Sequence, residues 1–145
     1  MGRLPNPATI TDVYNFDAAV EPVGRGHRST VSIATHRLTG KAVAVKQISR
    51  KVSNKSEVMS EVRMLKLAGV HPNVVSLQDF FEDKEAFYIV MDLVKGGELY
   101  DRLADKGRYS EGQAARIMAE VMEAVSFLHA TGIIHFDLKP ENIML

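Results

Sequence analysis

The sequence lacks cysteine altogether, and it lacks an excess of charge of either sign. Without cysteine the chain can form neither disulfides nor thiolate metal sites, so a reducing, cytoplasmic compartment is the simplest expectation. The 18 Lys and Arg residues balance 18 Asp and Glu residues, which gives no reason to expect nucleic acid or an anionic membrane as a partner. Long apolar runs and the basic-then-apolar pattern of a secretory signal are missing too, so we expect no membrane-spanning segment.

The first half of the chain is dominated by short alternating segments. Residues 1–12 form a lead-in, and an extended stretch from Val13 precedes the alternating segments TVSIATH and KAVAVKQI, which are separated by the turn-forming RLTG. Further on, AFYIVMDLV follows the turn EDKE, a pattern typical of the second strand of a hairpin. Together these patterns predict an antiparallel sheet of five strands.

Helical spacing of apolar residues interrupts and then follows these strands. It predicts one helix over 56–68, which Gly69 ends. After KGGEL, whose two glycines favour a hinge, we expect helices over 98–105 and 111–130, the latter begun by the capping box SEGQ. The final stretch, IIHFDLKPENIML, predicts a strand end, a loop and the start of another strand. The expected fold class is therefore α+β.

The stretch VGRGHRSTV, residues 23–31, places Gly24 and Gly26 between two predicted strands. Glycine at such a turn lets the backbone approach a phosphate closely and donate amide hydrogen bonds to it. A plain hairpin turn explains these two residues equally well when they are taken alone. A dinucleotide-binding motif is excluded because a strand follows instead of a helix, and a Walker loop is excluded because Gly-Lys-Ser/Thr is absent.

Lys46 ends an apolar strand, where an ammonium group needs a partner or a path to water. An ordinary edge-strand lysine is one interpretation. The other is an ion pair with Glu61, because Glu61 lies one helical turn from the inward-facing Leu65. A lysine held by such a pair could bind two phosphates of a nucleotide.

The stretch HFDLKPEN brings a carboxylate, an ammonium group and an amide into one short loop, at Asp137, Lys139 and Asn142. Phosphoryl transfer uses these groups to accept a hydroxyl proton, to steady the transferred phosphoryl group and to bind a divalent cation. A polar turn after a helix is the alternative interpretation. Pro140 and the apolar residues on both sides favour a fixed, chemically dedicated loop.

Taken in order, the glycine stretch, the strand lysine, the helix glutamate, HPNVV, MDLVKGGEL and HFDLKPEN resemble the motifs of eukaryotic protein kinases. The resemblance covers residues 13–145. It implies a kinase N-terminal lobe over 13–91 with a five-stranded sheet and helix C, a hinge over 92–97, and part of a helical C-terminal lobe over 98–145. The chain is most similar to the calcium/calmodulin-dependent group, including the death-associated kinases, which implies calmodulin or other calcium-linked regulators by analogy.

The resemblance implies ATP and Mg²⁺ as cofactors and a protein serine or threonine as the substrate. Lys46, paired with Glu61, would hold the α- and β-phosphates. Asp137 would be the catalytic base, Lys139 would contact the γ-phosphate, and Asn142 would bind magnesium. The other nucleotide contacts would come from the glycine turn, an apolar pocket with Met91 as gatekeeper, and the hinge: Val23, Gly24, Gly26, Val31, Ala44, Met91, Asp92, Val94, Glu98 and Met144. Lysine at position 139 is typical of serine/threonine kinases.

Some positions depart from the kinase pattern. Ser29 stands for the third glycine of the turn, and His27 and Arg28 add charge at its tip. Phe136 replaces the arginine that usually precedes the catalytic aspartate and pairs with a phosphorylated activation loop. We therefore expect that any activity does not depend on such phosphorylation.

The sequence stops at Leu145, before the positions at which kinases have Asp-Phe-Gly, the activation loop and further helices. This favours an N-terminal part of a serine/threonine kinase that is catalytically silent, or nearly so, as this chain alone. The alternative is a non-catalytic nucleotide-binding or decoy module derived from a kinase.

Overall fold

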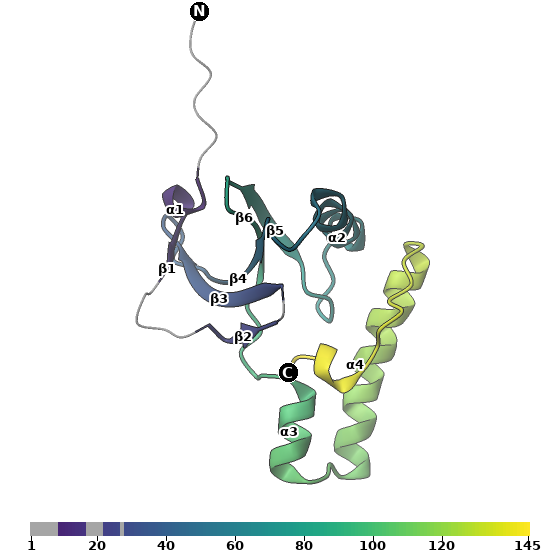
Figure 1. Ribbon diagram of the computed structural model, residues 1–145. Coiled ribbons are helices and arrows are strands. Elements are labelled where there is room, and N and C mark those ends of the chain that lie inside the picture. Colours follow the sequence, from purple (N-terminus) through teal and green to yellow (C-terminus); the bar gives the residue numbers. More distant parts are fainter. Residues whose placement is uncertain (1–8, 17–21, 27) are drawn as a thin grey trace, which may run out of the picture. The chain divides into compact units, whose positions relative to one another are not determined.

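The computed structural model describes residues 9–16, 22–26 and 28–145, which fall into two compact units (Figure 1). The sheet unit contains the described residues up to Arg63 together with Leu77–Leu93. The helical unit contains Met64–Ser76 and Val94–Leu145. We describe each unit by itself.

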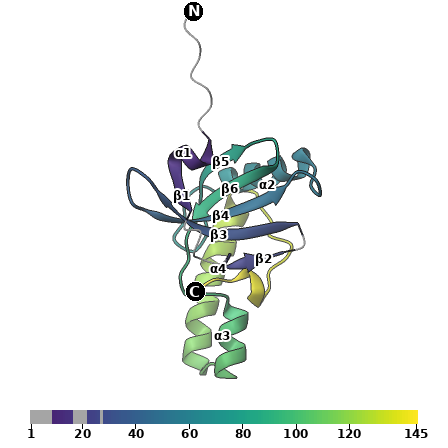
Figure 2. The ribbon, with the colours of Figure 1, turned by 60° about the vertical axis from the view of Figure 1, so that its left-hand side comes forward.

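The sheet unit is built on one antiparallel sheet, which curls in both ribbon views (Figures 1 and 2). Its strand order is β1-β3-β4-β6-β5, and β2 pairs with β3 as well. The strands are β1 Tyr14–Phe16, β2 Gly24–Arg25, β3 Ser29–His36, β4 Ala42–Ser49, β5 Leu77–Glu82 and β6 Ala86–Asp92. Because β1 and β2 pair with different stretches of β3, they occupy a single position beside it, where the sequence predicts one strand. The predicted antiparallel, five-strand arrangement is confirmed in this sense.

The register of the strands separates two faces of the sheet. One face carries a buried core cluster made of Ile10, Tyr14, Ala34, Val43, Val45 and Val90. Residues directly opposite one another in a ladder share a face, and side chains alternate along each strand. Lys46 is paired with Val31 and Ile89, so it lies on the other face.

A helical turn, α1 Ile10–Val13, begins the described chain and closes the core cluster. Its N-cap is Thr9, whose capping box uses Asp12, and its Ile10 side chain is only 6% exposed. The sequence pattern predicts this segment to be part of the lead-in. A helix of four residues is too short to show a period in the sequence, so only its tertiary contacts reveal it.

Strand β5 contains a bulge at Gln78. Leu77 stands opposite Met91 and Asp79 opposite Val90, so one residue is inserted between these pairs. The bulge turns Asp79 to the same face as Val90, and there Asp79 accepts a hydrogen bond from the buried Tyr14 hydroxyl.

Helix α2 Lys55–Ala68 matches the helix predicted over 56–68. Val58 and Val62 are 3% and 1% exposed, which confirms the predicted apolar spacing. Gly69 ends the helix with a φ of 66°, a left-handed conformation that favours glycine.

The helical unit contains α3 Leu99–Lys106, α4 Glu111–Ala130 and the 3₁₀ turn η1 Pro140–Asn142. The predicted capping box is present, because Gln113 N donates to the Ser110 hydroxyl and Ser110 N donates to the Gln113 side chain. The loop before β5 packs on α4: His71 stacks on Phe127, with ring centroids 4.6 Å apart, and Asn73 donates to the Glu120 carbonyl at 3.3 Å.

The predicted strands in IIHFDLKPENIML are wrong. Residues 133–139 are irregular, and the end of the chain forms only an isolated bridge between Glu98 and Met144. Leu99 N donates to Ile143 O at 2.8 Å, and Leu145 N donates to Gly97 O at 2.9 Å. A β-prone sequence forms a strand only where it can pair with another extended segment. Here the end of the chain pairs with the segment Gly97–Leu99 through these few contacts only. Among the described helices, none has the length and apolar character needed to cross a membrane.

Ile10→Ala should lower the free energy of unfolding by about 2 kcal/mol or more, because it removes most of a buried side chain from the core cluster. Leu38→Ala is the control, since Leu38 is 93% exposed, and it should change stability by less than about 0.5 kcal/mol. Urea unfolding followed by circular dichroism measures both effects. Equally small effects would show that α1 does not belong to the core.

Candidate active site

The glycine turn lies at the start of β3. Gly26 N donates to Ser29 O at 2.7 Å, which closes the turn. Gly24 belongs to β2, where the sequence places a turn, and His27 lies outside the described residues. A Cβ added at Gly24 or Gly26 would meet its nearest neighbours at 3.6 Å and 3.5 Å, ordinary contact distances, so packing against the described residues does not demand glycine at either position.

Lys46 and Glu61 form the predicted ion pair. The Lys46 ammonium lies 2.7 Å from a Glu61 carboxylate oxygen, and the side chains are 28% and 39% exposed. The pair joins β4 to α2, and partial exposure limits its contribution to stability to about 1 kcal/mol. Its main effect is to hold the ammonium group in one place.

The register brings several predicted nucleotide contacts beside Lys46. Val31 stands directly opposite Lys46, and Gly24 stands opposite Val31. Ala44 precedes Lys46 on the same face of β4 and stands opposite Met91 on β6. Val23, which directly precedes β2, is 58% exposed. An ammonium group bordered by apolar side chains is therefore present on one face of the sheet.

Arg28, the residue of the glycine turn that directly precedes β3, also contacts α2. Its guanidinium lies 3.4 Å from a Glu57 carboxylate oxygen, and both side chains are more than 60% exposed, at 62% and 64%. Glu57 and Glu61 are four residues apart and so lie on one side of the helix. Two cations of the sheet unit thus meet the same side of α2.

The remaining predicted nucleotide contacts lie at the end of β6 and beyond. Asp92 ends β6, and its carboxylate accepts hydrogen bonds from Lys41 and Gln78. Val94, Glu98 and Met144 belong to the helical unit, where Glu98 and Met144 are joined by the isolated bridge.

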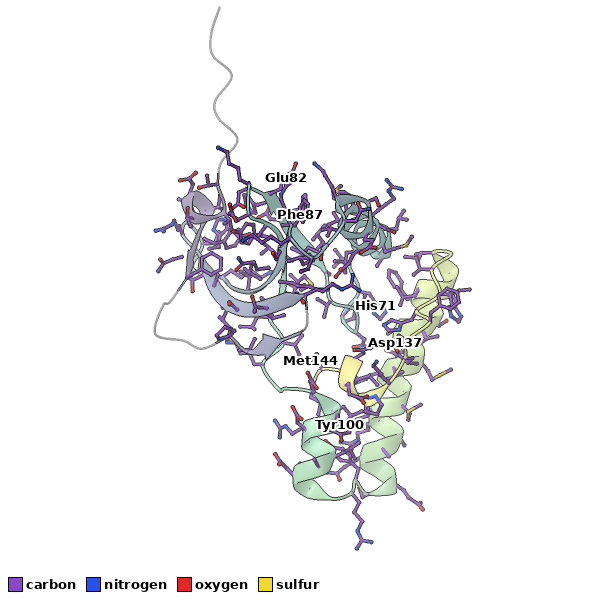
Figure 3. All side chains as sticks on the ribbon, in the orientation of Figure 1. His71, Glu82, Phe87, Tyr100, Asp137 and Met144 are labelled. Atoms are coloured by element: carbon purple, nitrogen blue, oxygen red, sulfur yellow. The ribbon has the colours of Figure 1, made fainter. Side chains whose placement is uncertain are left out.

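The loop before η1 brings together Asp137, Lys139 and Asn142, as predicted (Figure 3 labels Asp137). The Lys139 ammonium lies 3.0 Å from Asp137 Oδ2. The Asn142 amide nitrogen donates to the same oxygen at 3.0 Å and to the Asp137 carbonyl at 2.8 Å. All three side chains belong to an exposed surface of the helical unit.

Two hydrogen bonds stabilise the ionised form of the Asp137 carboxyl group. The hydrogen bond from Lys139 lowers the pKa of Asp137 below its usual range, and the hydrogen bond from Asn142 lowers it further. The same contact with Asp137 raises the pKa of Lys139. At neutral pH the cluster therefore presents a carboxylate beside an ammonium group.

Asn142 has the geometry to bind a hard cation. Both of these hydrogen bonds to Asp137 use the amide nitrogen of Asn142, so they leave its amide oxygen able to accept a ligand bond. Magnesium uses oxygen ligands and keeps several waters or phosphate oxygens in its shell. In the described part of the chain, no group of three or more His, Cys, Asp or Glu residues could hold a metal ion.

Phe136 has a feature that its sequence position does not reveal. Its φ is 57°, the one positive value among the described non-glycine residues, and its ring is 91% exposed. A left-handed conformation costs a bulky residue about 1 kcal/mol. The fold holds this strained residue directly before Asp137.

Comparisons with known proteins show the family of the chain. The Protein kinase domain family matches residues 18–145, so the chain belongs to this family. Calcium-dependent protein kinase 7 of Arabidopsis thaliana is 44% identical over 145 residues, covering 97% of this chain and 27% of its own. Myosin light chain kinase A of Dictyostelium discoideum is 38% identical over 139 residues, covering 94% of this chain and 46% of its own.

A solved structure shows the same fold. The structure of Rad53 residues 1–466 in complex with AMP-PNP superposes with a TM-score of 0.80 at 37% identity and covers 94% of this chain. The kinase fold expected from the sequence is thereby confirmed. The chain spans between about a quarter and a half of the length of these matched proteins, at 27%, 46% and 35%.

Lys139→Met should raise the pKa of Asp137 toward its ordinary value of 3.8, because the Lys139 hydrogen bond is the largest cause of the shift. Carboxyl-carbon NMR titration measures this. Lys106→Met, at a lysine that faces the Tyr109 ring, is the control and should leave the titration unchanged.

The lowered pKa of Asp137 determines how its contacts affect the stability of the fold at different pH values. Because the folded-state pKa of Asp137 is lowered, its contacts stabilise the fold at pH values above 3.8 and are lost as the pH falls through the lowered value. An Asp137 titration identical in the wild type and in Lys139→Met would show that the two side chains do not interact in solution.

Proposed function

We propose that this chain carries the nucleotide-binding and phosphoryl-transfer residues of a serine/threonine protein kinase, which transfers the γ-phosphoryl group of MgATP to a protein hydroxyl. The observation that carries the proposal is the cluster of Asp137, Lys139 and Asn142, in which each side chain is oriented by another. An ordinary polar turn does not require an ammonium group and an amide to meet on one oxygen of the same carboxylate.

The sheet unit would bind the nucleotide. The Lys46 ammonium, held by Glu61, would pair with phosphate oxygens, and the neighbouring apolar side chains of Val31, Ala44 and Met91 would cover the base. The glycine turn would bring backbone amides close to the phosphates. The absence of a packing requirement for glycine at 24 and 26, against the described residues, supports a role toward a ligand.

The helical unit would act on the substrate hydroxyl. Asp137, ionised at neutral pH, would accept a hydrogen bond from the hydroxyl and orient it for attack. Lys139 would exchange part of its contact with Asp137 for the transferred phosphoryl group. Asn142 would hold magnesium through its amide oxygen, and the ion would neutralise charge on the phosphate oxygens.

The same residues support a choice of substrate. Lys139 supports serine or threonine as the acceptor, as the kinase motif implies. Glu98 and Glu141 would offer carboxylates to a basic side chain of the protein substrate, or in the case of Glu98 to the ribose. Regulation by calcium or calmodulin and a cytoplasmic location belong to this proposal; the name of the calcium-dependent relative supports the former.

These 145 residues alone would bind nucleotide weakly and would not turn over. Asn142 is the one magnesium ligand that the motif supplies within them, and a single amide oxygen binds magnesium poorly without carboxylates. Nucleotide binding by this chain should therefore depend on Lys46 and only slightly on magnesium.

Lys46→Ala should weaken binding of AMP-PNP about tenfold, since a charge-assisted hydrogen bond to phosphate contributes on the order of 1.5 kcal/mol. Isothermal calorimetry measures the affinity. Lys51→Ala, at an exposed lysine just beyond β4, is the matched control and should bind like the wild type. Equal affinities for wild type and Lys46→Ala would remove Lys46 from the nucleotide site.

Phosphorylation of a serine peptide by the purified 145-residue chain should remain at background, because the magnesium shell is incomplete. A radiolabelled phosphate assay with wild type and Asp137→Asn side by side measures this. Robust transfer by the wild type that Asp137→Asn abolishes would contradict the predicted silence, while supporting the proposed role of Asp137.

A further inference from the structure

Asp92, the last residue of β6, is held from both neighbouring strands of the sheet. Its Oδ1 accepts a hydrogen bond from the Lys41 ammonium at 2.9 Å and another from the Gln78 side-chain amide at 2.9 Å. Lys41 directly precedes β4 and Gln78 lies in β5, and these two strands flank β6. We call these three residues the Asp92 clamp.

Gln78 is the inserted residue of the bulge in β5. Leu77 is paired with Met91 and Asp79 with Val90, so Gln78 has no residue opposite it in the ladder. A bulge changes the direction in which the side chain of the inserted residue leaves the strand.

The clamp restricts the orientation of the Asp92 carboxylate more than it stabilises the fold. The side chains of Asp92 and Lys41 are 36% and 53% exposed, and ion pairs at such exposure contribute little to the free energy of folding. Two donors from different strands on one oxygen, however, allow the carboxylate few orientations.

The place of Asp92 in the sheet makes this direction matter. The pairing of Asp92 with Val43 is the last one in the β4–β6 ladder, and strand ends open more readily than strand interiors. The clamp therefore holds Asp92 at the point where the hydrogen bonds of the β4–β6 ladder end and the backbone is less constrained.

We propose that Lys41 and Gln78 are positioning residues for the nucleobase: by holding the Asp92 side chain, they orient the Asp92 backbone for hydrogen bonding to the edge of adenine. The assignment rests on the proposed nucleotide-binding function. It gives Lys41 and Gln78 roles that neither the kinase motifs nor the sequence pattern indicates.

Two variants test the assignment. Gln78→Glu places a second carboxylate against Asp92. Gln78→Leu removes the hydrogen-bond donor without adding charge. Gln47→Glu, at an exposed glutamine of β4, is the control for the added charge. Amide hydrogen exchange at Asp92 and Leu93, followed by NMR without nucleotide, reports the backbone. Calorimetry with AMP-PNP and with inorganic tripolyphosphate separates base binding from phosphate binding.

Both Gln78 variants should exchange faster at Asp92 and Leu93, by about tenfold for the loss of one hydrogen bond to a charged group. AMP-PNP affinity should fall about threefold to tenfold, with tripolyphosphate affinity unchanged, and Gln47→Glu should match the wild type.

Unchanged exchange in both Gln78 variants, with intact AMP-PNP binding, would overturn the assignment alone. Equal losses of AMP-PNP and tripolyphosphate affinity would also overturn it, because the effect would not concern the base. If the unaltered chain bound no AMP-PNP, both the proposed function and this assignment would fall.

Discussion

Side chains alternate between the two faces of a strand, so the register of β3 against β4 and of β4 against β6 decides which residues of the sheet unit can meet. In the observed register Lys46 shares a face with Val31 and Met91. A shift of one residue in either ladder would send the ammonium group into the buried core cluster, where an unpaired charge is costly. The apolar residues of that cluster, such as Val43, Val45 and Val90, therefore determine on which face Lys46 lies.

Helix α2 completes this arrangement from outside the sheet. Its buried valines give it a fixed side, and Glu61 emerges where it meets Lys46. The ion pair is too exposed to determine the fold, but the fold determines where the ion pair forms. Arg28 reaches the same side of the helix through Glu57, so the glycine turn and the strand lysine both contact α2.

Much of this structure was predictable because its signals are local. The capping box at Ser110, the left-handed glycine at position 69 and the apolar spacing of α2 each depend on residues within a few positions of one another. The cluster of Asp137, Lys139 and Asn142 was predictable for the same reason, since a six-residue loop brings them together. The other predicted nucleotide contacts came from the order of the motifs, that is, from the resemblance to the kinases.

Other features depend on distant parts of the chain and have no local signal. Helical turn α1 exists because Ile10 finds a buried site among residues of β3, β4 and β6. The bulge at Gln78 appears only when β5 is laid against β6, and the strand expected after Gly132 fails to form because pairing requires a partner edge.

The sequence by itself determined the family, the alternation of strands and helices, and the chemical groups available for phosphate and magnesium, because these follow from residue type and spacing. Tertiary structure alone decided that Tyr14 meets Asp79 and that Asp92 is held by Lys41 and Gln78. It also settled that Lys46 pairs with Glu61, which the sequence left as one of two interpretations. These contacts join residues that are distant in the chain, and their geometry is set by how strands pair and side chains pack, which no short stretch of sequence specifies.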